Sequence, residues 1–178
     1  MPKIIENLNE TIILEGRKLL SNKGYKELNV REIAKNCNIA LGTFYNYFPT
    51  KDELILEIVR EDWRHLSDLI EKLKPIDEPI KEKIRKVFLS LEIFISSYVA
   101  IFIEMAMYKN YSYDHMSHDK FHLLYGKLSE LIELEKTKGH IQSPLESYKL
   151  AQLIMSNLIY LNTNKYISYD ELYDSLKI

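Results

Sequence analysis

Two tyrosines, an amide and a hydroxyl stand close together between residues 41 and 47. The stretch consists of Leu41, Gly42, Thr43, Phe44, Tyr45, Asn46 and Tyr47. On a helix, Phe44 and Phe48 would share one side, so the tyrosine and polar side chains point elsewhere. Such groups suit contacts with phosphates and base edges, and a glycine lets backbone N–H groups approach a phosphate. We therefore expect residues 41 to 47, apart from Phe44, to contact DNA.

Two short apolar-patterned segments, residues 30–37 and 41–48, frame this stretch. The three residues between them are too few for a strand-helix-strand crossover. They suit a helix-turn-helix, in which a short turn sets two helices at a steep angle. Asn29 is well placed to cap the first helix, with Glu32 as a capping-box-like partner. We expect the motif at about residues 29–48.

Helical periodicity continues through the rest of the chain. The expected helices are residues 4–23, 51–74, 79–97, 99–108 and 119–138, one that starts at Ser143-Pro144, and a short last one capped by Ser168 and Glu171. With the motif, these predict an all-α protein of about nine helices. Pro49 ends the motif, so we expect a DNA-binding domain over residues 1–50 and a helical ligand-binding and dimerisation domain over residues 51–178.

Charge is distributed unevenly between these two parts. The formal net charge is −2, but residues 1–51 contain eight Lys or Arg against five acids, whereas the remainder contains 16 against 21. A basic amino-terminal part on an acidic body would present one face to phosphate. No targeting signal stands out at the start, and the most apolar run, residues 93–108, is short for a membrane span. We expect a cytoplasmic protein with no membrane partner.

Motifs of enzymes are missing from the sequence, which contains no GxSxG, P-loop, GxGxxG or HExxH. The single cysteine, Cys37, excludes an intramolecular disulfide and fits a reducing compartment. Without a resolving partner it is expected to be a small core residue rather than a redox sensor. The sequence therefore predicts a protein that is not an enzyme and needs no cofactor.

The amino-terminal part of the chain contains the run IAKNCNIALGTFYNYFPTKDEL, with GYKELNV upstream. This run closely resembles the signature of the TetR (tetracycline-repressor-like) transcriptional regulators. The similarity covers roughly residues 8–58. It implies a three-helix DNA-binding head, an all-helical effector-binding body and a homodimer formed through the last two long helices. By family pattern, DNA contacts come from Thr43, Tyr45 and Tyr47, a phosphate clamp from Lys51, and backbone contacts from Asn29 or Arg31.

The function that the resemblance implies is ligand-responsive repression. A homodimer would bind a pseudo-palindromic DNA operator and be released by a small, largely apolar effector. Two residues depart from the family pattern: Ala40 stands where Ser or Thr usually caps the recognition helix, and Leu41 where Lys or Arg is frequent. A cap and a phosphate contact are then missing, or Leu41 touches a thymine methyl. A second hypothesis is therefore a helical small-molecule-binding or partner-binding protein with a weakened DNA head.

Aromatic and methionine side chains of the helical body are core residues by default, and they could also line a largely apolar cavity. The ligand-binding candidates are Trp63, Phe94, Tyr98, Phe102, Glu104, Met105, Tyr125 and Met155. Within this set Glu104 could be a counter-charge for a cationic ligand, unless it reaches the surface or is paired. For the homodimer implied by the resemblance, the interface candidates are Leu124, Leu128, Leu131, Ala151, Ile154 and Leu158.

Three histidines, His115, His118 and His122, could share a helix face and bind a metal with Asp119. The cluster straddles an expected loop-to-helix boundary and lacks thiolates. A solvated face is therefore the default interpretation, and no metal site is predicted.

Overall fold

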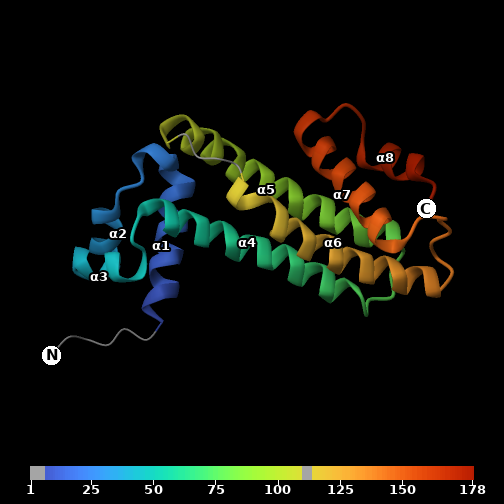
Figure 1. Ribbon diagram of the computed structural model, residues 1–178, viewed down its shortest axis with the longest axis horizontal. Coiled ribbons are helices and arrows are strands. Elements are labelled where there is room, and N and C mark those ends of the chain that lie inside the picture. Colours follow the sequence, from blue (N-terminus) through green and yellow to red (C-terminus); the bar gives the residue numbers. More distant parts are fainter. Residues whose placement is uncertain (1–6, 110–113) are drawn as a thin grey trace. The chain divides into compact units, whose positions relative to one another are not determined.

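The computed structural model describes residues 7–109 and 114–178, without the side chains of Phe102 and residues 106–121. The helices are α1 (Leu8–Glu27), α2 (Val30–Asn36), α3 (Leu41–Tyr47), α4 (Lys51–Leu73), α5 (Ile80–Lys109), α6 (Asp114–Thr137), α7 (Ser147–Asn164) and α8 (Tyr169–Leu176) (Figure 1). Within these ranges no residue is in a strand. The all-α prediction is confirmed, with eight helices in the described part of the chain.

Helix boundaries differ from expectation at four places. α6 begins at Asp114, five residues before the expected start at Asp119. α5 is one helix where two were expected, because Ser97-Tyr98-Val99 contains neither Gly nor Pro to interrupt it. α7 begins at Ser147 with Glu146 as its N-cap residue, four residues after the start expected at Ser143. α1 continues to Glu27 through a kink at Gly24. The φ of Gly24 is 77°, a backbone conformation that glycine adopts more easily than other residues.

The chain forms two compact units. The amino-terminal unit comprises Met1–Asp62 and Ser97–Tyr111, and the carboxyl-terminal unit comprises Trp63–Ser96 and Ser112–Ile178. α4 and α5 therefore each contribute residues to both units. The domain boundary expected at residue 50 stays a prediction.

A close approach between α1 and α4 organises the amino-terminal unit. A Cβ added at Gly16 would lie 2.8 Å from Leu54 Cδ2, and both residues are buried. This close helix crossing gives a physical reason for a glycine within α1. Ile12, Leu20 and Ile58 are buried in the same unit and supply its apolar core.

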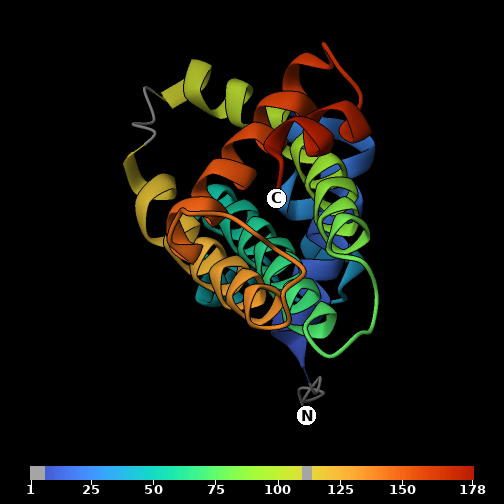
Figure 2. The same ribbon diagram turned by 90° about the vertical axis from the view of Figure 1, so that its right-hand side faces the viewer.

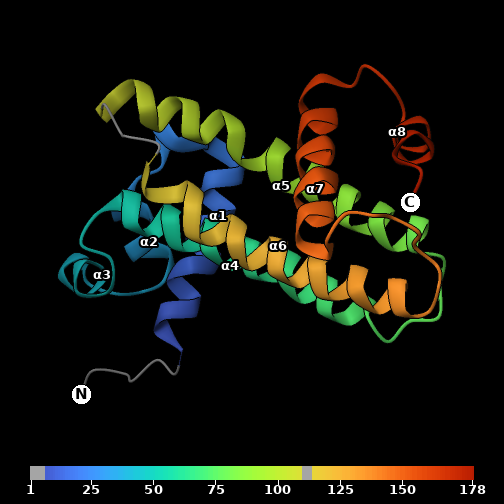
Figure 3. The ribbon, with the colours of Figure 1, turned by 45° about the vertical axis from the view of Figure 1, so that its right-hand side comes forward.

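The carboxyl-terminal unit has its own apolar core, to which five helices contribute. The second half of α4 runs beside α6 (Figures 1 and 2), and Glu71 accepts hydrogen bonds from Lys74 at 2.7 Å and pairs with Lys127 at 2.5 Å. α6 and α7 pack against each other (Figure 3). α8 is joined to α5 by the Arg85–Asp170 pair at 2.7 Å.

One ion pair lies inside this core. Lys83 Nζ donates to Glu135 Oε1 at 3.0 Å, and both residues are fully buried. Glu135 also accepts from Lys138 at 3.0 Å and pairs with His140 Nδ1 at 2.8 Å. Burial alone raises the pKa of this carboxyl, but the hydrogen bonds from His140, Lys83 and Lys138 outweigh it and lower the pKa to about 2.

Apolar composition is highest in α5. Its segment Ile80–Met105 is long and apolar enough to cross a membrane by length and composition, and 24% of its most apolar window is buried. A core helix of a water-soluble protein can meet the same two criteria. Composition alone therefore assigns no membrane role to α5.

Replacing Gly16 by valine is expected to push α1 away from Leu54 and to lower the free energy of unfolding by about 1–3 kcal/mol. Urea denaturation measures the change. Gly126→Val is the matched control, because a Cβ at Gly126 meets nothing within 4 Å. Equal unfolding midpoints for the two variants would contradict the close approach.

Glu135→Gln is expected to lower the free energy of unfolding at pH 7 by about 3–5 kcal/mol, because it leaves Lys83 buried without its counter-charge. The folded-state pKa of Glu135 is depressed, so its contribution is present above about pH 4.3, the unfolded value, and is lost as pH falls toward 2. The difference between wild type and variant should therefore shrink on acidification. Glu146→Gln, which removes an exposed carboxylate, should show neither effect in the same denaturation series.

Candidate nucleic-acid interface

α2 and α3 form the expected helix-turn-helix. Each contains seven residues, and Asn38 in the turn has a φ of 55°, in the left-handed region. The turn is closed by Ile39 N–H, which donates to Ala34 O at 2.9 Å. Asparagine tolerates this backbone conformation better than most residues, so Asn38 suits the reversal between the helices.

The inner side of α3 is anchored by two phenylalanines. Phe44 is fully buried and Phe48 nearly so, and their ring centroids lie 6.0 Å apart. From α2, Ile33 and Ala34 are buried in the same unit. These contacts determine which side of α3 faces solvent.

The opposite side of α3 carries the predicted DNA-contacting residues. Tyr45 and Tyr47 are 46% and 45% exposed, and Gly42 and Asn46 are exposed. Leu41 and Thr43 are partly buried at the edges of this side. The Tyr45 ring packs edge-on against Phe44 at 5.5 Å, which restricts its rotation. We call Leu41, Gly42, Thr43, Tyr45, Asn46 and Tyr47 the α3 outer face.

The two helices of the motif are capped differently. Asn29 caps α2 as expected, because its side chain accepts from Arg31 N–H at 2.9 Å. Glu32 does not complete a capping box there and pairs instead with Lys23 at 2.7 Å. At α3, Ala40 provides no side-chain cap. Asn29 and Arg31 are both exposed, so each is accessible to a phosphate backbone.

Lys51 lies at the start of α4, where its ammonium group turns back to the end of α1. Its Nζ donates to Tyr25 O at 2.9 Å and lies 4.2 Å from the centroid of the Tyr25 ring. The Tyr25 hydroxyl in turn donates to Asp52 at 2.9 Å. Lys51 thus stabilises the junction of α1 and α4, and its phosphate contact stays a prediction.

A polar network that the sequence did not predict joins α1, α4 and α5 within the amino-terminal unit. Arg17 pairs with Glu61 and Asp62 at 2.9 Å each, and the Tyr98 hydroxyl donates to Asp62. Burial and the bond to Asp62 raise the pKa of Tyr98, which keeps its hydroxyl a donor. Arg17 and its partners are more than forty residues apart, so no local pattern could have revealed this network.

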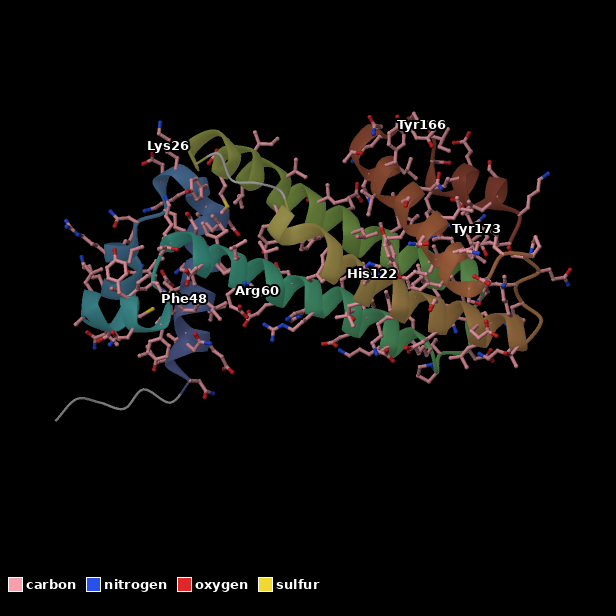
Figure 4. The ribbon with its side chains drawn as sticks, in the orientation of Figure 1. Lys26, Phe48, Arg60, His122, Tyr166 and Tyr173 are labelled. Carbon is pink, nitrogen blue, oxygen red and sulfur yellow. The ribbon has the colours of Figure 1, made fainter. Side chains whose placement is uncertain are left out.

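The ligand-binding candidates fall in both units. Trp63, Phe94, Tyr125 and Met155 belong to the carboxyl-terminal unit, and Tyr98, Glu104 and Met105 to the amino-terminal unit. Trp63 and Phe94 are brought together, with ring centroids 5.0 Å apart. Glu104 accepts from Lys26 N–H at 3.3 Å, at the end of α1 (Figure 4). The side chain of Phe102 lies outside the described residues.

The dimer-interface candidates require a correction. Leu124, Leu128, Leu131, Ala151, Ile154 and Leu158 are all at most 1% exposed within the single chain. They pack in the core of the carboxyl-terminal unit, so a second copy could not touch them without opening that core. The homodimer stays a prediction, but residues other than these six must form its interface.

Two further sequence expectations concern His122 and Cys37. His122 lies on α6 (Figure 4), where its Nδ1 is 2.6 Å from the Tyr148 hydroxyl. The side chains of His115, His118 and Asp119 lie outside the described residues, and no metal-binding group of three occurs among those described. Cys37 is buried as expected, and burial raises the pKa of its thiol, which makes it less reactive.

The motif matches a known protein family. Residues 12–58 match the family described as "Bacterial regulatory proteins, tetR family". Over 51 residues the chain is 47% identical to YuxN, an uncharacterized HTH-type transcriptional regulator of Bacillus subtilis, a match that covers 28% of this chain and 18% of YuxN. The chain spans less than two thirds of the length of the first curated relatives that it matches.

Solved structures extend the similarity of fold along almost the whole chain. Salmonella enterica GusR superimposes with a TM-score of 0.71 at 16% identity, covering 98% of this chain and 96% of GusR. Thermus thermophilus FadR, a transcriptional repressor in complex with lauroyl-CoA, superimposes with a TM-score of 0.60 at 19% identity, covering 94% and 90%. At sequence identities this low, the similarity supports a shared fold but does not indicate a shared ligand.

Lys51→Met should lower the free energy of unfolding by about 0.5–1.5 kcal/mol, because the Tyr25 carbonyl loses its charged donor and keeps only the longer hydrogen bond from Leu28 N–H at 3.4 Å. Chemical denaturation measures the loss. Lys35→Met is the control, since Lys35 is exposed on α2. If both variants were as stable as wild type, the junction would not depend on Lys51.

Proposed function

Because the chain belongs to the TetR family of bacterial regulatory proteins, we propose that it is a cytoplasmic transcriptional repressor that binds a DNA operator and responds to a small molecule. The observation that carries this proposal is the α3 outer face. It exposes two tyrosines, an asparagine and a glycine on a helix whose other side is buried. Exposed aromatic side chains on so short a helix have little structural purpose, whereas they suit contacts with a nucleic acid.

The charge of the motif supports a DNA partner. Arg31 and Lys35 are exposed on α2, the helix before the recognition helix, and in this arrangement the first helix crosses the phosphate backbone. α3 would enter the major groove. Two copies of the chain would place their recognition helices in successive major grooves, about 34 Å apart on a pseudo-palindromic site. This geometry is the reason for proposing a homodimer.

The helical body would bind the effector. Trp63 and Met155 are buried in the core of the carboxyl-terminal unit, and Phe94 and Tyr125 are partly buried against it. Apolar and aromatic side chains with a nearby hydroxyl are of the kind that line sites for largely apolar ligands. The FadR structure with a similar fold contains lauroyl-CoA, so a long-chain acyl-CoA is a suitable first probe.

α4 would transmit the effector signal to the DNA. It begins at Lys51, directly after the motif, and continues to Leu73 in the core of the carboxyl-terminal unit. Arg17 on α1 pairs with Glu61 and Asp62 on the same helix. An effector that binds one orientation of α4 better than another would shift the population between them and change operator affinity.

Selection of random duplexes on the purified full-length protein tests the DNA function. We expect a palindromic sequence whose affinity falls steeply with salt, and lauroyl-CoA should lower that affinity tenfold or more, by about 1.4 kcal/mol of coupling. Lys35→Ala should weaken binding to every duplex and reduce the salt slope by about 1.

The results separate the parts of the proposal. If no sequence is enriched even at low salt, DNA binding is refuted, and the alternative of a helical ligand-binding protein with a weakened head is favoured by the uncapped start of α3. Compounds that co-purify with the protein can be identified by mass spectrometry and tested beside lauroyl-CoA. If the enriched operator is bound with the same affinity with and without each of these compounds, DNA binding stands and the proposed effector switch is refuted.

A further inference from the structure

The chemistry of the α3 outer face restricts the bases that it can read. From Asn36 to Thr50, fifteen consecutive residues carry no charged side chain, and this stretch includes all of α3. Guanine presents two acceptors, O6 and N7, in the major groove, and it is most often read by Arg or Lys. α3 has neither residue, so its own side chains cannot make this bidentate contact with guanine.

Asn46 occupies the centre of the outer face. Successive residues of an α-helix are about 100° apart, so Asn46, two residues after the fully buried Phe44, points to the opposite side of the helix. Gly42 lies one turn before Asn46 on the same side, and a Cβ added there would meet nothing within 4 Å. A base-pair edge can therefore approach the asparagine amide closely without meeting a neighbouring side chain from that turn.

The side chains around Asn46 suit thymine better than cytosine. Leu41 is partly exposed and ends in methyl groups, and Thr43 carries one methyl beside its hydroxyl. Apolar contact with the C5-methyl group is the feature that identifies thymine in the major groove. Tyr45 and Tyr47 carry hydroxyls that both donate and accept, so they can contact phosphates or bases with little discrimination.

Cations of the motif lie outside α3. Arg31 and Lys35 are exposed on α2, and Lys51 follows on α4. Contacts from such side chains to phosphates contribute affinity and orientation but carry no direct sequence information. Affinity and base identity are thus assigned to different helices of the motif.

We propose that α3 reads a half-site composed of A·T pairs and that Asn46 identifies one adenine within it. The amide oxygen of Asn46 accepts from the adenine N6 amino group while its nitrogen donates to N7, and Leu41 and Thr43 contact thymine methyls. This inference rests on the proposed operator-binding function and adds the sequence class of the operator.

Duplex selection with wild type and variants tests the inference. Wild type should enrich half-sites with A·T pairs at the positions facing α3. Replacing the adenine read by Asn46 with 7-deazaadenine, which lacks the N7 acceptor, should weaken wild-type binding about tenfold and leave Asn46→Ala binding unchanged. Asn46→Arg should shift the preference at that one pair from A·T to G·C. Lys35→Ala should weaken binding without changing the selected sequence.

Each outcome has one interpretation. Failure to enrich any sequence refutes the proposed DNA-binding function itself. An enriched palindrome with G·C pairs facing α3, or equal loss on 7-deazaadenine for wild type and Asn46→Ala, refutes the base assignment and leaves the DNA-binding function standing. Circular dichroism of each variant establishes that the fold is retained before binding is compared.

Discussion

Burial of Phe44 is the contact on which the DNA-facing surface depends. α2 and α3 have seven residues each, well below the roughly 12–15 residues that an isolated helix needs to be stable in water. Neither helix would persist without packing. With Phe44 fully buried and Phe48 beside it, one side of α3 is held inside the unit. The opposite side, with Asn46 at its centre, is turned outward by the same contact.

The helix that follows the motif is held to α1 by polar contacts as well as by the Gly16 crossing. Lys51 donates to the end of α1, Tyr25 donates to Asp52, and Arg17 pairs with residues near the middle of α4. These groups are half-buried or buried, so moving α4 relative to α1 would break charge-assisted hydrogen bonds. Such a junction favours a small number of discrete orientations over continuous bending, as the proposed switch requires.

Within the carboxyl-terminal unit, the apolar core and the buried ion pair stabilise the packing of that unit's own helices. Lys83 and Glu135 are buried together and join α5 to α6, while the leucines of α6 and α7 fill the space between these helices. An apolar stripe on a long helix looks the same in sequence whether it faces its own core or another subunit. Only their burial within one chain assigns Leu124 and Leu158 to the core.

The amino-acid sequence by itself determined the features that depend on neighbouring residues. The motif at 29–48, the caps at Asn29 and Ser168, and the buried side of α3 follow from side chains within one or two helical turns. Tertiary structure alone decided the partners that are distant in sequence, such as Arg17 with Asp62, Lys51 with Tyr25 and Lys83 with Glu135. The physical reason is that helical periodicity records which side of a helix is apolar, whereas the identity of the helix packed against that side depends on the path of the whole chain.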